Sequence, residues 1–375
     1  MQVNADLHIH SCFSIATSRQ MRPAALIEGC LRKGIDLLGS GDGLHPGWRK
    51  MWVEAEGAAE VQIIPTAEVE GAGRIHHLII MEHFADFEEL ARVLDPYSTN
   101  ISSAGRPFVS LDGGRLAAKV HDLGGLIGPA HAFTPWTGMY GRVECARACY
   151  GEEHFDFLEL GLSADTGYGD AIPELKGIPF LSSSDAHSPF PGSLGREFTR
   201  LDLGGRSGRD VLESVCSGRI VMNAGFFPEQ GKYNRTACTR CFARYLIPEA
   251  VSHGWTCPSC GGRIKKGVFD RARELALGEP SPRPPYCHII PLIEIVRLVA
   301  GTRSPRSARC QRRYEALIAS LGPEIQILID RPLDAIARID HDLSEAIGAF
   351  RKGEIEISPG GGGQYGSLTL PKKGN

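Results

Sequence analysis

Short apolar runs alternate with helical patterns from Met1 to about Phe226, and few folds satisfy such an alternation. Alternating strands and helices indicate parallel βα units. About seven units without a Gly-x-Gly-x-x-Gly loop favour a (β/α) barrel over an open nucleotide-binding sheet. The expected strands are Val3–His10, Ile35–Gly39, Val61–Thr66, Ile75–Met81, Gly125–Ala130, Phe155–Leu160 and Pro179–Ser183, and the helices between them include Pro23–Lys33, Phe87–Leu94, Leu116–Asp122 and Gly208–Ser217.

Residue types that bind metal ions fall at the ends of these runs. In the first run Asp6, His8 and His10 alternate, so on a strand they project to one face. Because the carboxyl ends of barrel strands meet at one mouth, similar residues from other runs should arrive at the same place. Imidazole together with carboxylate suits Zn, Mn or Fe. Any one of these side chains could instead be a satisfied core or loop residue. The later members are Asp42, His45, Glu68, His77, His131, Asp185 and His187.

The motifs resemble, in order, those of the PHP (polymerase and histidinol phosphatase) phosphoesterases. The resemblance rests on Asp6–His10, Glu68, His77, Gly128–His131 and Ser184–His187 and covers about the first 225 residues. It implies a distorted (β/α)7 barrel that holds two or three divalent ions (Zn, Mn or Mg). In such enzymes, water activated on one metal attacks the phosphodiester while another metal stabilises the leaving oxygen.

The same resemblance implies roles for individual residues. His8 and His10 would bind a first metal, with Glu68 bridging and Asp185 completing it, and these four would form the catalytic centre. His77 and His131 would hold a second metal, and His187 with Asp42 or His45 a third. The third position stays open, because Asp42-Gly43-Leu44-His45 departs from the adjacent Asp-His of the family. Asp6 is expected to orient a ligand histidine.

Two Cys-x-x-Cys pairs follow the predicted barrel. Cys238 and Cys241 are separated by 15 residues from Cys257 and Cys260. Paired knuckles at this distance predict one structural zinc in a ribbon, because four thiolates close the coordination shell. The alternative is a redox dithiol, for which the sequence offers no thioredoxin-like context.

Charge is unevenly distributed along the chain. The net charge is −3, but residues 231–313 contain 16 Lys and Arg against 5 Asp and Glu. This asymmetry suggests a basic module carried by an acidic one, although it could also be a solvated basic surface without a partner. Guanidinium groups pair well with phosphates, so the predicted DNA-backbone contacts are Arg303, Arg306, Arg309, Arg312, Lys265 and Lys266.

A second resemblance extends over nearly the whole chain. The barrel, the ribbon, Pro284–Tyr286 with Ile290–Ile295, and finally Pro359–Gly366 are similar to the endonuclease Q family. That family comprises metal-dependent DNA repair enzymes that nick 5′ to deaminated bases (uracil, hypoxanthine, xanthine) or abasic sites. The resemblance implies that the barrel cuts, while the ribbon and a helical domain hold the duplex and receive the lesion. Flipping a damaged base out of the stack costs little, and the candidate stacking residues are Tyr286, Phe269 and Trp136.

The resulting expectation has four parts. These are a PHP metal-dependent phosphoesterase barrel (1–225), a zinc ribbon (226–282), a small, mainly helical C-terminal domain (283–358), and a Gly-rich tail (359–375) that could form a tight turn or be flexible. Helices are expected at about Pro291–Val299, Tyr314–Leu321 and Leu333–Lys352.

Two other functions use the same features. A small-molecule phosphatase of the histidinol-phosphate type would need the barrel but not the basic segment or the ribbon. A non-enzymatic nucleic-acid-binding adaptor would not need the metal-type residues. No apolar run approaches the ~20 residues that span a bilayer, and the odd number of cysteines, 11, fits a reducing compartment. We therefore expect a cytoplasmic enzyme whose partner is double-stranded DNA with deaminated bases, and no membrane association.

Overall fold

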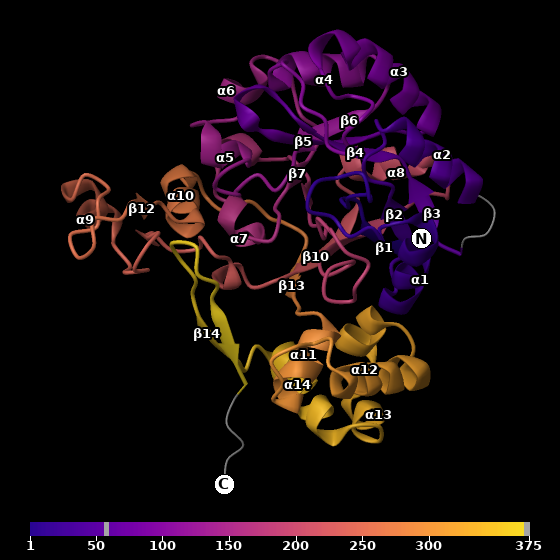
Figure 1. Cartoon of the computed structure of the whole chain (residues 1–375), viewed down its shortest axis with the longest axis vertical. Coiled ribbons are helices and arrows are strands. Elements are labelled where there is room, and N and C mark those ends of the chain that lie inside the picture. Colours follow the sequence, from indigo (N-terminus) through magenta and orange to yellow (C-terminus); the bar gives the residue numbers. More distant parts are fainter. Residues whose placement is uncertain (56–59, 371–375) are drawn as a thin grey trace.

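The computed structural model describes residues 1–55 and 60–370. A large α/β part carries a thin lateral extension and, below it, a group of helices (Figure 1). Buried apolar side chains form separate clusters in these regions: several in the α/β part, one in the helices and a small one in the extension.

The strands of the α/β part form a distorted barrel. Strands β1 (Gln2–Asp6), β2 (Leu37–Gly39) and β3 (Gln62–Ile64) pair in parallel. A second sheet contains β4 (Thr66–Glu70), β5 (His76–Ile80) and β6 (Leu126–Pro129), and β7 (Leu158–Glu159) pairs in parallel with β8 (Phe180–Leu181). A parallel bridge between Ile9 and Ala186 joins the segments that follow β1 and β8 and brings these two parts of the barrel together.

The barrel is less regular than the parallel units that the alternation predicts. Strand β5 runs antiparallel to both β4 and β6, because Gly71 to Ile75 turn the chain back as a hairpin. Strands β9 (Phe198–Asp202) and β10 (Ile220–Gly225) extend the β1 side antiparallel, and β13 (Tyr286–His288) pairs with β10 at the edge. The predictions missed β4, β9, β10 and β13.

Helices cover the outside of the barrel, and their predicted positions are largely confirmed. Helix α1 matches its expected bounds and ends at Gly34, whose φ of +84° suits a glycine. Asp112 caps α4 by accepting a hydrogen bond from the Arg115 N–H. The bounds are α1 Pro23–Lys33, α2 Pro46–Ala55, α3 Phe84–Leu94, α4 Gly113–His121, α5 Met139–Arg142, α6 Arg147–Tyr150, α7 Thr166–Gly169 and α8 Gly208–Cys216.

The extension is the four-cysteine ribbon. It contains β11 (Ala237–Cys238) paired antiparallel with β12 (Ile264–Lys265), the short helix α9 (Ile247–Ser252), and α10 (Val268–Leu275) where it rejoins the barrel. Its buried cluster consists only of Cys238, Ala250, Cys257 and Ile264. So small a core needs additional stabilisation.

The C-terminal helices pack around one apolar cluster that includes Tyr314, Leu343 and Ile347. They are α11 (Leu292–Ala300), α12 (Ala308–Leu321), α13 (Leu333–Ala337) and α14 (His341–Lys352), with a π-turn at Gln326–Asp330. Helix α12 begins earlier than expected because Ser307 caps it, and the expected single helix over 333–352 is divided at Asp340, which caps α14. None of the described helices is long and apolar enough to cross a bilayer.

The Gly-rich segment is a tight turn rather than a flexible tail. It joins β14 (Glu356–Ser358) to β15 (Ser367–Thr369), and its tip lies against the ribbon. A Cβ on Gly362 would lie 2.2 Å from the Cys238 carbonyl oxygen, and Gly360 accepts a hydrogen bond from the Arg235 N–H. Glycine is therefore needed for the close backbone approach. Residues 371–375 of the expected tail lie outside the described residues, and the predicted domain boundaries remain proposals.

Candidate metal centre and cavity

A first group of metal-type atoms lies at the mouth of the barrel where β1 ends. His8 Nε2 and His10 Nε2 are 3.8 and 3.2 Å from the same oxygen, Asp185 Oδ1. All three atoms are buried and have no hydrogen-bond partner. Buried polar atoms are nearly always paired, whereas ligands of one divalent ion stand at about this spacing. The donor set therefore fits a metal ion.

A second group lies beside the first, and Glu68 belongs to both. Glu68 Oε1 is 2.7 Å from His76 Nδ1 and 2.8 Å from His131 Nε2, while its Oε2 is 3.3 Å from His10 Nε2. Burial alone would raise the pKa of Glu68, but the charge of His76 and the contacts with His10 and His131 lower it well below the ordinary value. A carboxylate held between two imidazole groups in this way is suited to bridge two metal ions, as expected.

The structure corrects the assignment of His77. Its side chain points to the opposite face of β5 from His76, and Nδ1 lies 2.8 Å from the Tyr150 hydroxyl. Burial lowers the pKa of His77 to about 3, which keeps the ring neutral. The cause is the hairpin register: His76 stands opposite Glu70 and shares the face of Glu68, whereas His77 stands opposite Val69.

The expected third-metal residues do not converge on one point. Asp42 lies behind His10, with Oδ1 3.1 Å from Nδ1, and it accepts hydrogen bonds from Ser11 and Ser14. Asp42 therefore orients the ring of His10, the kind of role that the sequence predicts for Asp6. His45 stacks on Phe13 and accepts a hydrogen bond from the Trp48 N–H.

His187 lies beside the first group, with its ring centre 4.5 Å from that of His10. Its Nδ1 is 3.0 Å from the Asp185 carbonyl oxygen. Asp6 has a different role from the one expected. Its two oxygens accept the N–H groups of Ser184 and Gly195, and burial raises its pKa to about 6. Asp6 therefore fixes the backbone that leads to Asp185 rather than a histidine ring.

Sequence reasoning missed two further side chains near the centre. Glu159 Oε2 is 2.9 Å from His8 Nδ1 and also accepts the His131 N–H, so it holds two histidines. The sequence does mark Glu159, because an acidic residue is unusual near the end of a predicted apolar strand. Arg106 donates to Glu68 Oε2 at 2.9 Å from the loop before Pro107, a position that no local pattern marks.

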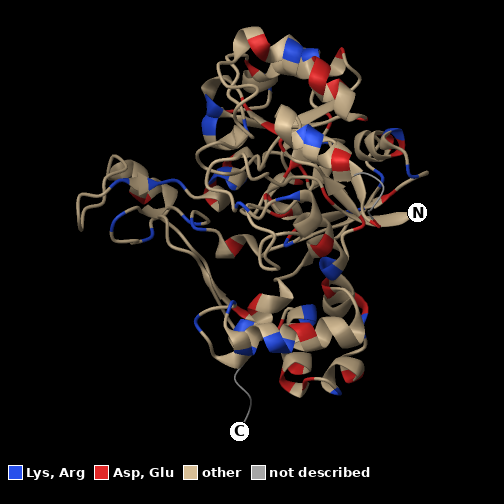
Figure 2. Ribbon diagram, turned by 45° about the vertical axis from the view of Figure 1, so that its right-hand side comes forward, with Lys and Arg blue, Asp and Glu red and all other residues tan. Residues whose placement is uncertain are grey.

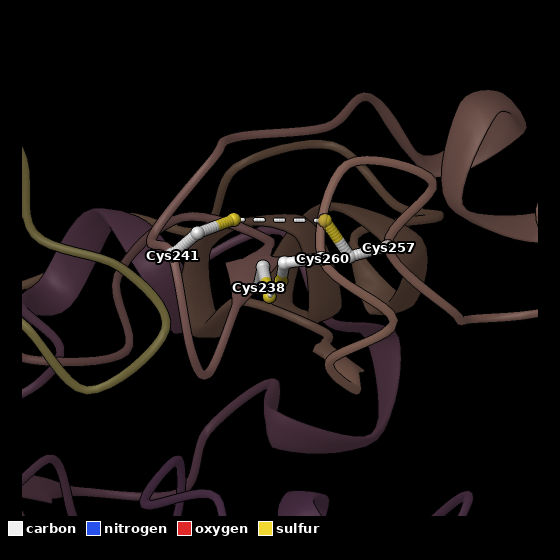
Figure 3. Close-up of side chains that lie close together, drawn as sticks. All are labelled: Cys238, Cys241, Cys257 and Cys260. Carbon is white, nitrogen blue, oxygen red and sulfur yellow. Dashed lines mark hydrogen bonds between the residues drawn. The ribbon is translucent and has the colours of Figure 1, made fainter.

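The four cysteines of the ribbon come together as predicted. Their sulfur atoms lie within 4.8 Å of one another, and Figure 3 shows the two knuckles facing each other. The Tyr245 hydroxyl lies 3.0 Å from Cys257 Sγ. Four converging thiols with no open position fit a structural zinc ion.

A cavity of about 860 Å³ begins at the metal-type cluster and extends between the barrel, the segment 230–233 that leads into the ribbon, helix α11 and the β14–β15 hairpin. His131, Asp185 and Arg196 line its inner end, and Phe226, Arg297 and Leu368 line it farther out. Of the three proposed stacking residues only Trp136 lines it, together with Tyr233. Phe269 is covered by Arg235, and the Tyr286 hydroxyl is buried beneath the barrel sheet.

The six predicted basic contacts all belong to the described residues, and none of them lines this cavity. Lys265 Nζ is 4.0 Å from the Trp136 ring centre, and Figure 2 shows more Lys and Arg than Asp and Glu on the ribbon. Lys266 pairs with Glu274. Arg306 stacks on Phe190, which belongs to the loop after His187. Arg309 and Arg312 are exposed on α12, and Arg303 lies in the loop that precedes it.

Comparisons with known proteins agree with this architecture. Residues 291–354 match the family model of the MJ0043 C-terminal domain. The uncharacterized protein YqxK of Bacillus subtilis is 31% identical over 406 residues, covering 98% of this chain and 99% of that protein. The uncharacterized protein MJ0043 of Methanocaldococcus jannaschii is 42% identical over 252 residues, or 65% of this chain, and this match spans only 32% of that relative.

Two solved structures match the full length of the chain. The lesion-specific endonuclease PfuEndoQ from Pyrococcus furiosus superposes with a TM-score of 0.96 at 41% identity, covering 100% of this chain and 98% of that one. Endonuclease Q in complex with a 27-mer duplex that has an abasic lesion at the active site gives 0.94 at 41% identity, with the same coverage. The predicted α/β barrel, four-cysteine ribbon and helical C-terminal part are thereby confirmed, whereas the PHP type of the barrel remains an inference from the motifs. This chain belongs to the endonuclease Q family.

Proposed function

We propose that this protein is a metal-dependent DNA repair endonuclease that hydrolyses the phosphodiester 5′ to a deaminated base (uracil, hypoxanthine or xanthine) or an abasic site. The observation that carries the proposal is the Glu68-centred cluster opening directly into a cavity of about 860 Å³. The full-length relative that binds an abasic duplex at its active site supports DNA as the partner. The deaminated bases rest on the family resemblance of the motifs.

The chemistry follows from the cluster. Two divalent ions, when bound, supply the activated water and the charge that stabilises the leaving oxygen. His8, His10 and Asp185 would hold one ion and His76 with His131 the other, while Glu68 sets their separation. Glu159 and Asp42 fix the rings of His8 and His10 from behind. We also propose that the ribbon holds one structural zinc ion.

Lesion recognition is assigned to the cavity. Its volume is within the range of small-molecule sites and is large enough for a nucleotide outside the helix. Trp136 is 45% exposed, with Lys265 Nζ 4.0 Å above its ring and Tyr233 at right angles 6.0 Å away. A nucleotide stacked there would place its 5′ phosphate toward His131 and Asp185. The basic residues of the ribbon and α12 would hold the backbone on either side.

The two alternatives have less support. A small-molecule phosphatase needs no basic ribbon beside its site, and an adaptor needs no buried and converging ligand set. A nicking assay tests the proposal. End-labelled duplexes with one deoxyuridine, one deoxyinosine, one abasic site or none are incubated with Mg²⁺ or Mn²⁺. We expect a single cut just 5′ of each lesion and none in the unmodified duplex. Phosphate release from small esters without any nick would favour the phosphatase.

A further inference from the structure

A buried ion pair joins the barrel to the C-terminal helices. Lys33 ends α1, and Glu324 lies between α12 and the π-turn; their side chains are 2% and 1% exposed. Lys33 Nζ is 2.6 Å from Glu324 Oε1. In Figure 1, α1 lies directly above the helical group. Lys and Glu are rarely buried so completely, and a buried pair by itself is weak evidence for stability. The pair therefore calls for another role.

Both charged groups make further hydrogen bonds in addition to their ion pair. Glu324 accepts the Leu292 N–H at the start of α11 and the Tyr314 hydroxyl from α12, each at 2.9 Å. Lys33 donates a second hydrogen bond, of 2.7 Å, to the carbonyl oxygen of Pro191. One ammonium group thus connects three segments: α1, the helical group, and the loop at 188–195.

That loop leads directly from the metal centre. It follows Asp185 and His187, and Gly192 within it lines the cavity. At its end the Gly195 N–H donates to Asp6, which also holds the Ser184 N–H, and Arg196 donates to the carbonyl oxygens of Ser184 and Asp185. The middle of the loop is held by Lys33. A shift at Pro191 would therefore be transmitted to Asp185.

We propose that Lys33 and Glu324 are positioning residues, through which docking of the C-terminal helices sets the loop at 188–195 and, with it, Asp185 and the cavity wall. The inference rests on the proposed function for its catalytic readout. It makes the helical group part of the cutting machinery and not only a DNA-holding module.

The same interface offers a matched control. Arg32, next to Lys33 on α1, pairs with Glu315 of α12, but both side chains are substantially exposed. This pair also joins α1 to the C-terminal helices and makes no hydrogen bond to the loop, and the Arg32 guanidinium lies 5.5 Å from the Tyr314 ring centre. An exposed pair contributes little to stability, so Arg32→Ala tests contact between the elements without disturbing Pro191.

The experiment compares Glu324→Gln, Lys33→Met and the double variant Lys33→Met/Glu324→Gln with Arg32→Ala. Thermal unfolding, single-turnover nicking and duplex affinity are measured for each. The single variants leave one buried charge unpaired and should be less stable. The double variant should recover most of this stability, because no charge is left unpaired. Its nicking rate should stay about tenfold or more below wild type at unchanged DNA affinity, because the Pro191 carbonyl has lost its donor.

A double variant that recovers both stability and nicking rate would show that the pair is only structural. The assignment would also be overturned if Arg32→Ala slowed nicking as much as Lys33→Met/Glu324→Gln is expected to do. Mn²⁺ affinity of the zinc-loaded protein, measured by electron paramagnetic resonance, separates this proposal from the function itself. If the wild type nicks no duplex, the proposed function fails. The positioning role then still predicts weaker Mn²⁺ binding in the double variant, and unchanged binding refutes it.

Discussion

At the scale of single residues, the backbone is strained where the metal-type side chains converge. Asp185, Asp42 and His131 have φ values of +46°, +47° and +31°, which non-glycine residues rarely adopt. Such strain costs on the order of 1–3 kcal/mol per residue and persists where the surroundings impose it. Here hydrogen bonds hold these conformations. The Ser11 N–H donates to Asp42, the His131 N–H donates to Glu159, and the Ser184 N–H beside Asp185 donates to Asp6. The strain sits at the centre that we assign to catalysis.

The two adjacent histidines of β5 give a direct residue-scale prediction. His76→Ala removes a ring that contacts Glu68 and should abolish nicking and weaken Mn²⁺ binding. His77→Ala removes only a buried contact with Tyr150 and should lower stability by on the order of 1–3 kcal/mol while nicking continues. Rates and urea unfolding of both variants check this. The reverse pattern would restore His77 to the centre.

Glu197 predicts a pH dependence of stability. It is buried at the start of β9, accepts the Phe226 N–H, and burial raises its pKa from 4.5 to about 8. Because the folded-state pKa is the higher one, folding favours the protonated acid. The stabilisation is complete below about pH 4.5 and is lost as pH rises through about 8. Glu197→Gln should therefore gain on the order of a few kcal/mol relative to wild type at pH 9. Parallel unfolding profiles from pH 5 to 9 would contradict this.

At the scale of elements, the predicted DNA contacts are on α12, on the loop before it and on the ribbon. Arg309→Ala should weaken binding to every duplex and reduce the slope of log affinity against log salt by about one, since one phosphate contact is lost. Arg209→Ala on α8, which lies on the barrel and pairs with Glu213, serves as the control. An altered lesion preference with an unchanged slope would rule out a phosphate contact at Arg309.

The ribbon makes a separate prediction. Cys257→Ser should remove one zinc ion per chain and unfold the ribbon, because the buried cluster of the ribbon is too small to keep it folded without the metal. The barrel ligands are on other elements, so Mn²⁺ binding there should persist. Metal analysis before and after dialysis measures both. Retention of the zinc would mean that the four cysteines are not its ligands.

The sequence predicted individual helices and motifs better than strand direction, strand register and contacts between distant segments. Helix α1 and the cysteine ribbon follow from local signals, a proline start with a glycine end and fixed Cys spacing. The antiparallel β5 does not, because its direction is set by a hairpin whose register the sequence leaves open. That register decides between His76 and His77. Arg106 and the Lys33–Glu324 pair depend on tertiary contacts between segments far apart in the chain.

At the scale of the whole molecule, the barrel, helix α11 and the β14–β15 hairpin surround one cavity, and the turn of that hairpin also contacts the chain at Arg235, where the ribbon begins. His131 and Asp185 of the metal-type cluster line this cavity. Under the proposed function, a duplex held outside the cavity would present a displaced nucleotide to the barrel. The central claim is therefore that the cluster around Glu68 and Asp185 cuts DNA.

The measurement that tests this claim most directly compares wild type with Asp185→Asn on one end-labelled deoxyuridine duplex with Mn²⁺. Binding and single-turnover nicking are followed in the same samples, and Asp202→Asn, which alters an exposed pair with the N-terminus, is the control. We expect unchanged duplex affinity and no nick for Asp185→Asn, with normal nicking by the control. A cutting rate equal to that of wild type would show that the barrel cluster is not the cutting site.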